Sequence, residues 1–264
     1  MLLAADVGNT EIVLGVFRGS ELTHTWRLST QPERTADELA LVLGGFLAQG
    51  GMSFESQVTG LVAASVVPDV TAAIREMAGR YFPFAPVLVG PGTKTGVPIL
   101  TDNPREVGAD RVVNTLAAFT KFGGPAIVVD FGTATNFDVV SSDGAFMGGV
   151  IAPGMQASAA SLFSRTARLT RVELTPPPNV IGKSTVEAIQ SGLIFGTAGE
   201  VDSIVTRIRG ELGDASVVAT GGLAPVVIPY CTTIDHHEPW LTLEGLRLVF
   251  EKNPLGHELG DADA

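Results

Sequence analysis

Two stretches of the same kind, one in each half of the chain, most constrain the fold. Residues 6–10 read Asp-Val-Gly-Asn-Thr and residues 130–135 read Asp-Phe-Gly-Thr-Ala-Thr. Each ends an apolar run that predicts a strand, at 2–6 and 126–130, and each is followed by further alternating runs separated by Gly-containing turns. The chain is therefore expected to contain two copies of one hairpin-led unit.

The remaining pattern alternates between strands and helices. Thr35 and Glu38, and again Ser184 and Glu187, have the spacing of a helical capping box. The further strands are expected at 11–17, 22–29, 58–67, 86–89, 136–140, 145–152 and 216–219, and the helices after Thr35 and at 70–81, 156–169, 185–212 and 243–252.

This alternation indicates an α/β architecture, and the hairpins require mixed sheets, which excludes a simple Rossmann repeat. A length of 264 residues suits two domains. We expect an N-terminal domain over residues 1–120, a C-terminal domain over 121–253, and a frayed tail over 254–264.

Charge and cysteine content narrow the function classes. A net charge of -11 and a pI near 4.8 argue against nucleic acid as a partner, because no basic surface collects phosphates. Cys231 is the one cysteine, so an internal disulfide or a multi-cysteine zinc site is excluded and a cytoplasmic location is expected. The start lacks a signal-peptide pattern. Glycines and prolines interrupt the uncharged runs 144–164 and 215–234, so we expect no membrane association.

The two Asp-x-Gly turns carry chemistry that suits phosphate. Asp6 and Asp130 end their predicted strands, where a carboxylate can hold Mg²⁺, and the following glycine lets a phosphate approach the N–H groups of the turn. A single Asp-x-Gly is usually an ordinary turn. Two that head matched hairpins favour a nucleotide site.

A third glycine-rich element follows the predicted strand 216–219. Gly221 and Gly222 lie in the sequence Ala-Thr-Gly-Gly-Leu-Ala, where bare backbone could accept a flat adenine ring or a ribose. A tight strand-to-helix turn explains the same residues. Neither a Walker pattern nor a Gly-x-Gly-x-x-Gly fingerprint accompanies it.

Together these three elements resemble the phosphate-1, phosphate-2 and adenosine elements of the acetate-and-sugar-kinase, heat-shock-chaperone and actin superfamily. Within that superfamily, Gly108-Ala109-Asp110-Arg111 resembles the Gly-x-Asp-Arg signature of type III pantothenate kinases. The resemblance covers residues 3–253, and further similar stretches lie at 148–154, 181–185 and 235–241.

The resemblance implies a fold and a reaction. The fold is a duplicated actin-like, ribonuclease H-like one, with two mixed-sheet domains flanked by helices and a cleft between them. The reaction is ATP-dependent phosphorylation of pantothenate to 4'-phosphopantothenate, the first step of coenzyme A biosynthesis, with Mg²⁺ and a monovalent cation, K⁺ or NH₄⁺.

The resemblance also implies residue roles. Asp110 is the expected general base, Asp130 the ligand of the monovalent cation, and Asp6 a possible Mg²⁺ ligand. Thr185 comes from the neighbouring subunit of a homodimer, which places the active site at the interface. The implied ATP contacts are Asp6, Val7, Gly8, Asn9, Thr10, Glu11, Ile12, Val13, Gly132, Thr133, Gly221 and Gly222, and the implied pantothenate contacts are Gly108, Ala109, Asp110, Arg111 and Thr185.

The residue types fit this chemistry. A carboxylate at Asp110 can orient a hydroxyl and take its proton late, since phosphoryl transfer needs alignment more than a strong base. Arg111 can pair with a substrate carboxylate, although adjacent Asp and Arg also form ordinary surface ion pairs. The sequence departs from the family pattern at Thr101, where a tyrosine is common, and at Asn136, where a threonine is common.

Two other functions stay open at this point. One is a different phosphotransferase or a phosphatase of the same superfamily, which would act without pantothenate. The other is a nucleotide-binding scaffold or regulator without turnover. The stretch from Asn103 to Arg111 speaks against the first, and the presence of Asp6, Asp110, Arg111 and Asp130 together speaks against the second.

Overall fold

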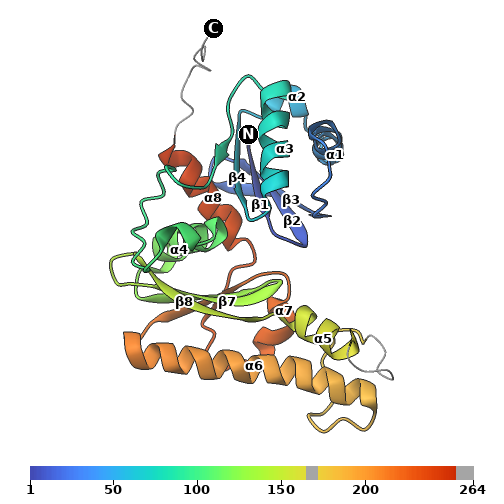
Figure 1. Ribbon diagram of the computed structural model, residues 1–264, viewed down its shortest axis with the longest axis vertical. Coiled ribbons are helices and arrows are strands. Elements are labelled where there is room, and N and C mark those ends of the chain that lie inside the picture. The colour runs from blue at the N-terminus through green and yellow to red at the C-terminus, as the bar shows by residue number, and fades with distance from the viewer. Residues whose placement is uncertain (165–171, 254–264) are drawn as a thin grey trace. The chain divides into compact units, whose positions relative to one another are not determined.

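The computed structural model describes residues 1–164 and 172–253, which form two compact units that are discontinuous in sequence (Figure 1). Unit 1 comprises Met1–Gly96, Arg105–Ala117 and the described residues from Thr242 onward, and unit 2 comprises Val97–Pro104 and Ala118–Leu241. The boundary expected at residue 120 lies near the one at Ala117. The segment from Thr242, however, joins unit 1 and not the C-terminal domain. The tail expected at 254–264 lies outside the described residues.

The sheet of unit 1 has the strand order β3-β2-β1-β4-β5. Its strands are β1 (Leu2–Val7), β2 (Glu11–Arg18), β3 (Glu21–Ser29), β4 (Gly60–Ser65) and β5 (Val87–Leu88). β1 pairs antiparallel with β2 and parallel with β4, so the sheet is mixed, as predicted. Nearly every side chain of β1 is buried, as expected of a central strand covered on both faces.

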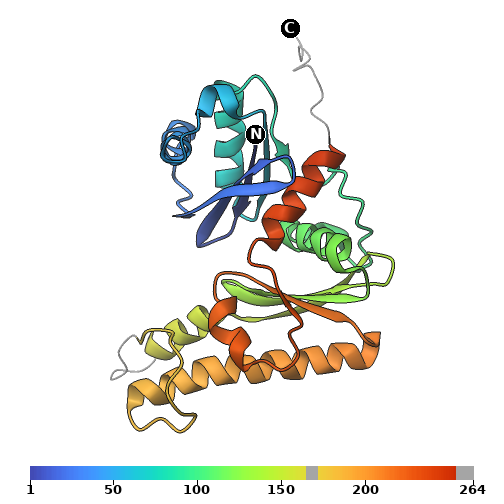
Figure 2. The ribbon, with the colours of Figure 1, turned by 180° about the vertical axis from the view of Figure 1, so that it is seen from behind.

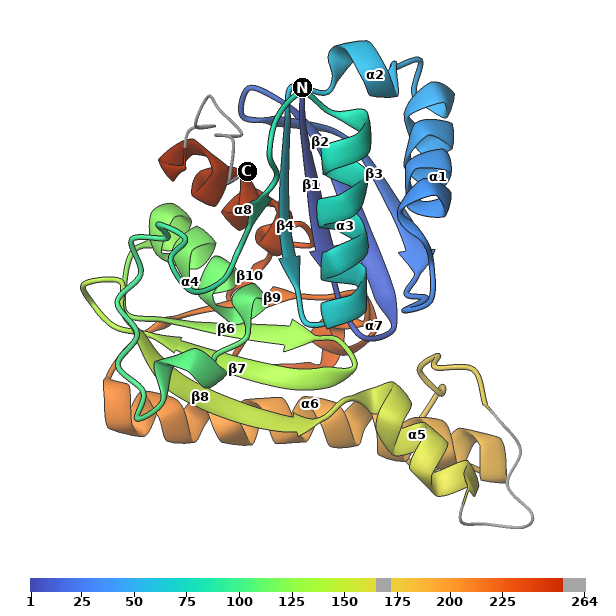
Figure 3. The ribbon, with the colours of Figure 1, turned by 45° about the horizontal axis from the view of Figure 1, so that its top comes forward.

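Helices cover both faces of this sheet. α1 (Ala36–Gln49) and α3 (Pro68–Tyr81) share a core with one face and lie over it in Figure 3, and α2 (Phe54–Gln57) is a short turn before β4. α8 (Leu241–Lys252) packs on the other face, where Leu243 fills the space beside Gly15. The capping box of α1 is confirmed, because Glu38 N–H donates to Thr35 Oγ1 at 3.3 Å and Thr35 N–H donates to Glu38 Oε2 at 2.9 Å.

The sheet of unit 2 repeats the topology of the first. Its strands are β6 (Ala126–Phe131), β7 (Ala134–Val140), β8 (Phe146–Pro153), β9 (Ser216–Thr220) and β10 (His236–His237), in the order β10-β9-β6-β7-β8. β6 pairs antiparallel with β7 and parallel with β9, which is the pairing of β1 with β2 and β4. The predicted duplication of a structural unit is therefore confirmed.

α6 (Thr185–Leu212) and α5 (Met155–Ser164) pack against this sheet with the short α7 (Ala224–Val227), as Figure 2 shows from behind. α6 has the predicted bounds. Its capping differs from the prediction: Glu187 N–H donates to Ser184 Oγ at 3.2 Å, but the Glu187 carboxylate accepts from Lys183 N–H at 2.7 Å. α5 starts one residue before the predicted helix, whose last residues, 165–169, lie outside the described range. The described helices include none that is both long and apolar enough to cross a membrane.

The sequence analysis missed α4 (Ala109–Phe122). Its buried residues Val112, Val113 and Leu116 have helical spacing, which is the signal that could have revealed it. The helix has a direct consequence for the site, because it places the Gly-x-Asp-Arg stretch at a helix N-terminus.

Candidate active site

The loop between β1 and β2 is a tight turn held by its neighbours. Gly8 N–H donates to Glu11 O at 3.0 Å, and Thr30 fixes the loop twice: its Oγ1 donates to Gly8 O at 2.7 Å, and its N–H donates to Thr10 O at 3.0 Å. Asp6 lies opposite Val13 in the hairpin. Asn9, Thr10 and Glu11 are exposed at the tip. Thr30 was not among the predicted residues, since its role depends on strand pairing.

The N-terminus of α4 positions the Asp110 carboxylate. Asp110 Oδ1 accepts a hydrogen bond from Arg111 N–H at 2.9 Å, and Arg111 N–H also points to Gly108 O at 3.1 Å. A Cβ on Gly108 would overlap Asp110 Oδ1, so glycine is required to leave the carboxylate in place. Burial raises the pKa of Asp110 above its ordinary value, and the contacts with Arg111 oppose this only in part. The arrangement is that of a partly desolvated carboxylate held in one orientation.

In unit 2 the residue after β8, Gly154, packs directly against the turn between β6 and β7. Gly132 N–H donates to Ala134 O at 3.0 Å. A Cβ on Gly154 would overlap the carbonyl oxygen of Thr133, so the backbones of the two segments touch directly. The Thr133 side chain is exposed at the turn. Gly154 had been noted only as part of a similar stretch, and no sequence signal reveals this contact.

The Thr-Gly-Gly turn after β9 lies against the end of β6. Gly221 has φ +94°, and a Cβ there would lie 2.5 Å from Asp130 Oδ1 and 2.6 Å from both N and O of Phe131. Leu223 N–H donates to Phe131 O at 3.3 Å. The predicted phosphate-2 and adenosine elements of unit 2 are thus neighbours, and Asp130 lies where they meet.

Thr185 is the first residue of α6 and is exposed. The preceding loop is held down on the helix: Ser191 Oγ donates to Val180 O at 2.6 Å, and a Cβ on Gly182 would overlap the N atom of Ala188. Thr185 therefore projects from a fixed turn of unit 2. Asp110 and Arg111 belong to unit 1, so Thr185 lies on a different unit from these two predicted pantothenate contacts.

Asp6 and Asp130 are single carboxylates at their strand ends. In the described residues no group of three or more His, Cys, Asp or Glu side chains could hold a metal by itself. A single carboxylate fits Mg²⁺, which commonly takes one or two carboxylates and completes its shell with water and substrate phosphates. It does not fit a structural zinc site.

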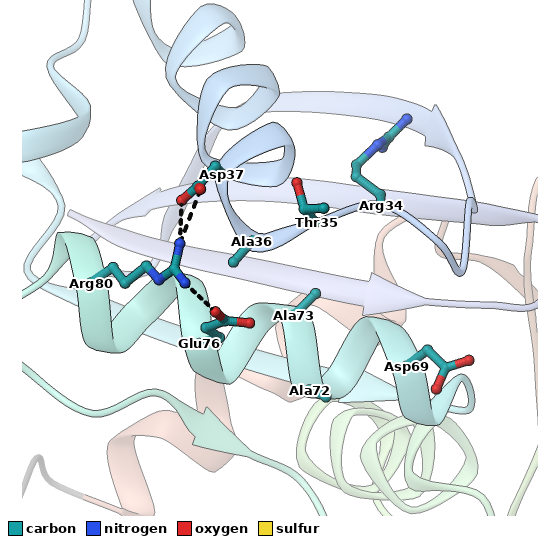
Figure 4. Close-up of a pocket in the computed structure, with 9 residues that line it drawn as sticks. All are labelled: Arg34, Thr35, Ala36, Asp37, Asp69, Ala72, Ala73, Glu76 and Arg80. Atoms are coloured by element: carbon teal, nitrogen blue, oxygen red, sulfur yellow. Dashed lines mark hydrogen bonds and ion pairs between the residues drawn. The ribbon is translucent and has the colours of Figure 1, made fainter.

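A separate groove of about 380 Å³ lies between the N-terminal part of α1 and the length of α3 (Figure 4). Arg80 spans its wall, donating to Asp37 on α1 and to Glu76 on its own helix. These ion pairs are about half exposed, and such pairs contribute little stability. None of the nine lining residues is a predicted site residue.

The comparisons with known proteins agree with the elements described above. The family model for Type III pantothenate kinase matches residues 2–207. A Type III pantothenate kinase of Acidothermus cellulolyticus is 57% identical over 255 residues, covering 96% of this chain and 99% of the relative.

Solved structures show the same architecture at low identity. A Campylobacter jejuni protein assigned to the Baf family of transcriptional activators has a TM-score of 0.59 at 17% identity, covering 96% of this chain and 98% of its own. A Listeria monocytogenes protein assigned as an N-acetylmannosamine kinase has a TM-score of 0.54 at 13% identity, covering 96% and 99%. At these identities the likeness concerns the fold alone, and it confirms the predicted actin-like fold class.

Proposed function

Because this chain belongs to the type III pantothenate kinase family, we infer that it transfers a phosphoryl group from ATP to pantothenate in coenzyme A biosynthesis, and we propose the residues that carry the reaction. The observation that carries the proposal is the Asp110 carboxylate, which is desolvated and held over Gly108 at the start of α4. A fixed carboxylate of this kind suits a hydroxyl acceptor.

Asp110 is the proposed general base. Its carboxylate accepts the hydrogen bond of the primary hydroxyl of pantothenate and orients the oxygen toward the γ-phosphorus. It takes the proton as the new P–O bond forms and the bond from the γ-phosphorus to the bridging oxygen breaks, which releases ADP. Arg111 offers a planar guanidinium to the carboxylate of pantothenate. In unit 2, Thr133 and the turn at Gly132 are the proposed phosphate contacts, and Gly221 and Gly222 the proposed contacts of the nucleoside.

ATP and a divalent metal are the cofactors of this reaction, and Asp6 is the proposed residue of unit 1 that holds the metal. When bound, Mg²⁺ neutralises charge on the transferring phosphoryl group. The loop from Asp6 to Val13 offers backbone N–H groups to the phosphates. These N–H groups matter because the chain has a net charge of -11 and offers few cationic side chains to bind a triphosphate.

A coupled assay of ADP release tests this function. With Mg²⁺ and ATP, release is expected to require pantothenate and to be absent without an acceptor or with a sugar in its place. Acceptor-independent release of ADP would support the phosphatase reading. Binding of ATP without any turnover would support the scaffold reading.

The monovalent cation is proposed to lie at Asp130. Asp130→Asn removes the negative charge at the junction of β6 and the Gly221 turn, so turnover should lose its response to potassium over a bulky organic cation. The control is Asp6→Asn, the equivalent residue of the other sheet, whose residual turnover should still respond to potassium. An unchanged potassium response in Asp130→Asn would place the cation elsewhere.

We also propose a homodimer formed through unit 2, with Thr185 of the partner subunit completing the pantothenate site. Unit 2 exposes apolar side chains on β8, the edge strand of its sheet, on α5, and in the first turn of α6 and the segment before it. Exposed apolar side chains of this size are often buried when a protein binds a partner. The exposed residues are Met147, Val150, Ile151, Leu162, Val180, Ile181 and Val186.

Ile181→Asp tests the dimer. Ile181 is 84% exposed, so the substitution costs the isolated subunit little but places a charge in the proposed interface. Light scattering should show a dimer for the unsubstituted protein and a monomer for the variant, and pantothenate-dependent turnover should fall with the loss of the dimer. Leu41→Asp, at a residue 77% exposed on α1, is the matched control and should change neither mass nor turnover. A fully active monomer of the unsubstituted protein would contradict the proposal.

A further inference from the structure

Asn114 is an amide side chain enclosed in the interior of unit 1. It lies on α4, one helical turn after Asp110, and is 1% exposed. Its Oδ1 accepts a hydrogen bond of 2.8 Å from Oγ1 of Thr242 on α8. Within residues 1–164 and 172–253, no group accepts a hydrogen bond from its Nδ2. A buried donor of this kind is costly and rare, and its retention calls for a physical reason.

The two helices that share this bond are fixed closely to each other. A Cβ on Gly245 of α8 would overlap the carbonyl oxygen of Val113 on α4, so the two backbones touch without a side chain between them. Figures 1 and 2 show the pair. The Thr242–Asn114 bond lies beside this contact. It adds a directional restraint that apolar packing lacks, and so fixes the rotation of α4 about its axis.

Asn114 and Asp110 lie on the same side of α4. Residues four apart share one face of a helix, and a helical side chain leans over the turn on its N-terminal side. For Asn114 that turn contains Asp110 and Arg111. The Asp110 carboxylate receives the Arg111 N–H on Oδ1, so its direction follows the rotation of α4 about its axis.

We propose that Asn114 is a positioning residue for the phosphoryl transfer: the hydrogen bond from Thr242 holds its side chain against α8, and this fixes the rotation of α4 that directs the Asp110 carboxylate. The inference rests on the proposed role of Asp110. Because Asn114 is buried, it touches neither pantothenate nor nucleotide and acts through Asp110 alone.

The clamp is tested by Thr242→Val, which keeps the shape of the side chain and removes the hydroxyl donor. We expect kcat to fall about tenfold or more, as small displacements of a reacting group do, while KM for ATP changes less than about twofold because the nucleotide contacts are elsewhere. Thr242→Ser retains the hydroxyl and should restore most of kcat. A kcat unchanged in Thr242→Val, or an equal loss in Thr242→Ser, would overturn the clamp.

The Asn114 side of the clamp is tested by Asn114→Leu, which is similar in size and cannot accept the hydrogen bond of Thr242. It should lower kcat at least as much as Thr242→Val and leave KM for ATP within about twofold of its original value. Ile74→Val on α3 is the control for stability, since it removes one buried methylene far along the chain from α4. It should lower the thermal midpoint and leave kcat unchanged. An equal loss of kcat in Ile74→Val would show that stability alone explains the effect.

The outcomes separate this inference from the function on which it rests. Absence of pantothenate-dependent turnover in the unsubstituted protein would overturn both. Normal turnover with unchanged kcat in Asn114→Leu would overturn only the positioning role. If Asn114→Leu fails to fold, the Val and Ser variants of Thr242 decide the question.

Discussion

Replacing Asp110 by asparagine is expected to lower kcat by about a hundredfold or more, the usual contribution of a general base, and to raise the thermal stability of the protein at neutral pH. The loss follows because an amide cannot take the proton of the hydroxyl. Binding of ATP should survive, since the proposed nucleotide contacts lie on other elements. Steady-state kinetics and nucleotide titration check these effects.

The gain in stability follows from the raised pKa of Asp110. A carboxyl whose folded pKa lies above its unfolded value contributes stability while it is protonated and loses that contribution as the pH rises through the folded pKa. At neutral pH the ionised Asp110 therefore opposes folding, and asparagine removes the buried charge. The difference in thermal midpoint between the variant and the unsubstituted protein should shrink below about pH 4, where aspartate is protonated in both states. Full activity in Asp110→Asn would reject Asp110 as the base.

Replacing Gly221 by alanine is expected to destabilise unit 2 by roughly 2–4 kcal/mol and to raise KM for ATP about tenfold. The positive φ of +94° is strained for any residue with a Cβ, and the added carbon would lie 2.5–2.6 Å from Asp130 Oδ1 and from the backbone of Phe131. Strain and overlap each cost about 1–2 kcal/mol. The neighbours in this case are mostly backbone atoms of β6, which cannot rotate away.

Gly210→Ala is the matched control for this substitution. Gly210 lies inside α6 and is exposed, and a Cβ there meets nothing within 4 Å. Alanine should stabilise the helix by about 0.5–1 kcal/mol and leave KM for ATP unchanged. Thermal unfolding and ATP titration of both variants make the comparison. Equal stability and ATP affinity in Gly221→Ala and the unsubstituted protein would contradict the packing of the Thr-Gly-Gly turn on Asp130.

The strand framework was predictable because its signals are local. Alternating apolar residues, two Asp-x-Gly turns and the capping residue Thr35 indicated the hairpins, the mixed sheets and α1 from short windows of sequence. β5 and β10 have only two residues each at the sheet edges. Pairing with a neighbouring strand defines such elements, so the sequence indicated β5 only approximately and gave no separate signal for β10.

The sequence named candidate site residues but gave no indication of their geometry. α4 escaped prediction because Asn114 and Thr115 interrupt its apolar face, although both are buried. The return of α8 to unit 1 depends on its contacts with Gly15 and Gly60, which are far away in sequence. The support of Asp110 by Gly108 became visible only with the backbone of α4 in place.

The measurement that tests the central claim most directly is ³¹P NMR of the products formed from ATP, Mg²⁺ and pantothenate. A new phosphomonoester resonance, matching ADP in amount and absent without pantothenate, is the result expected of a pantothenate kinase. Inorganic phosphate in place of that resonance would show that water accepts the phosphoryl group, and would contradict the account.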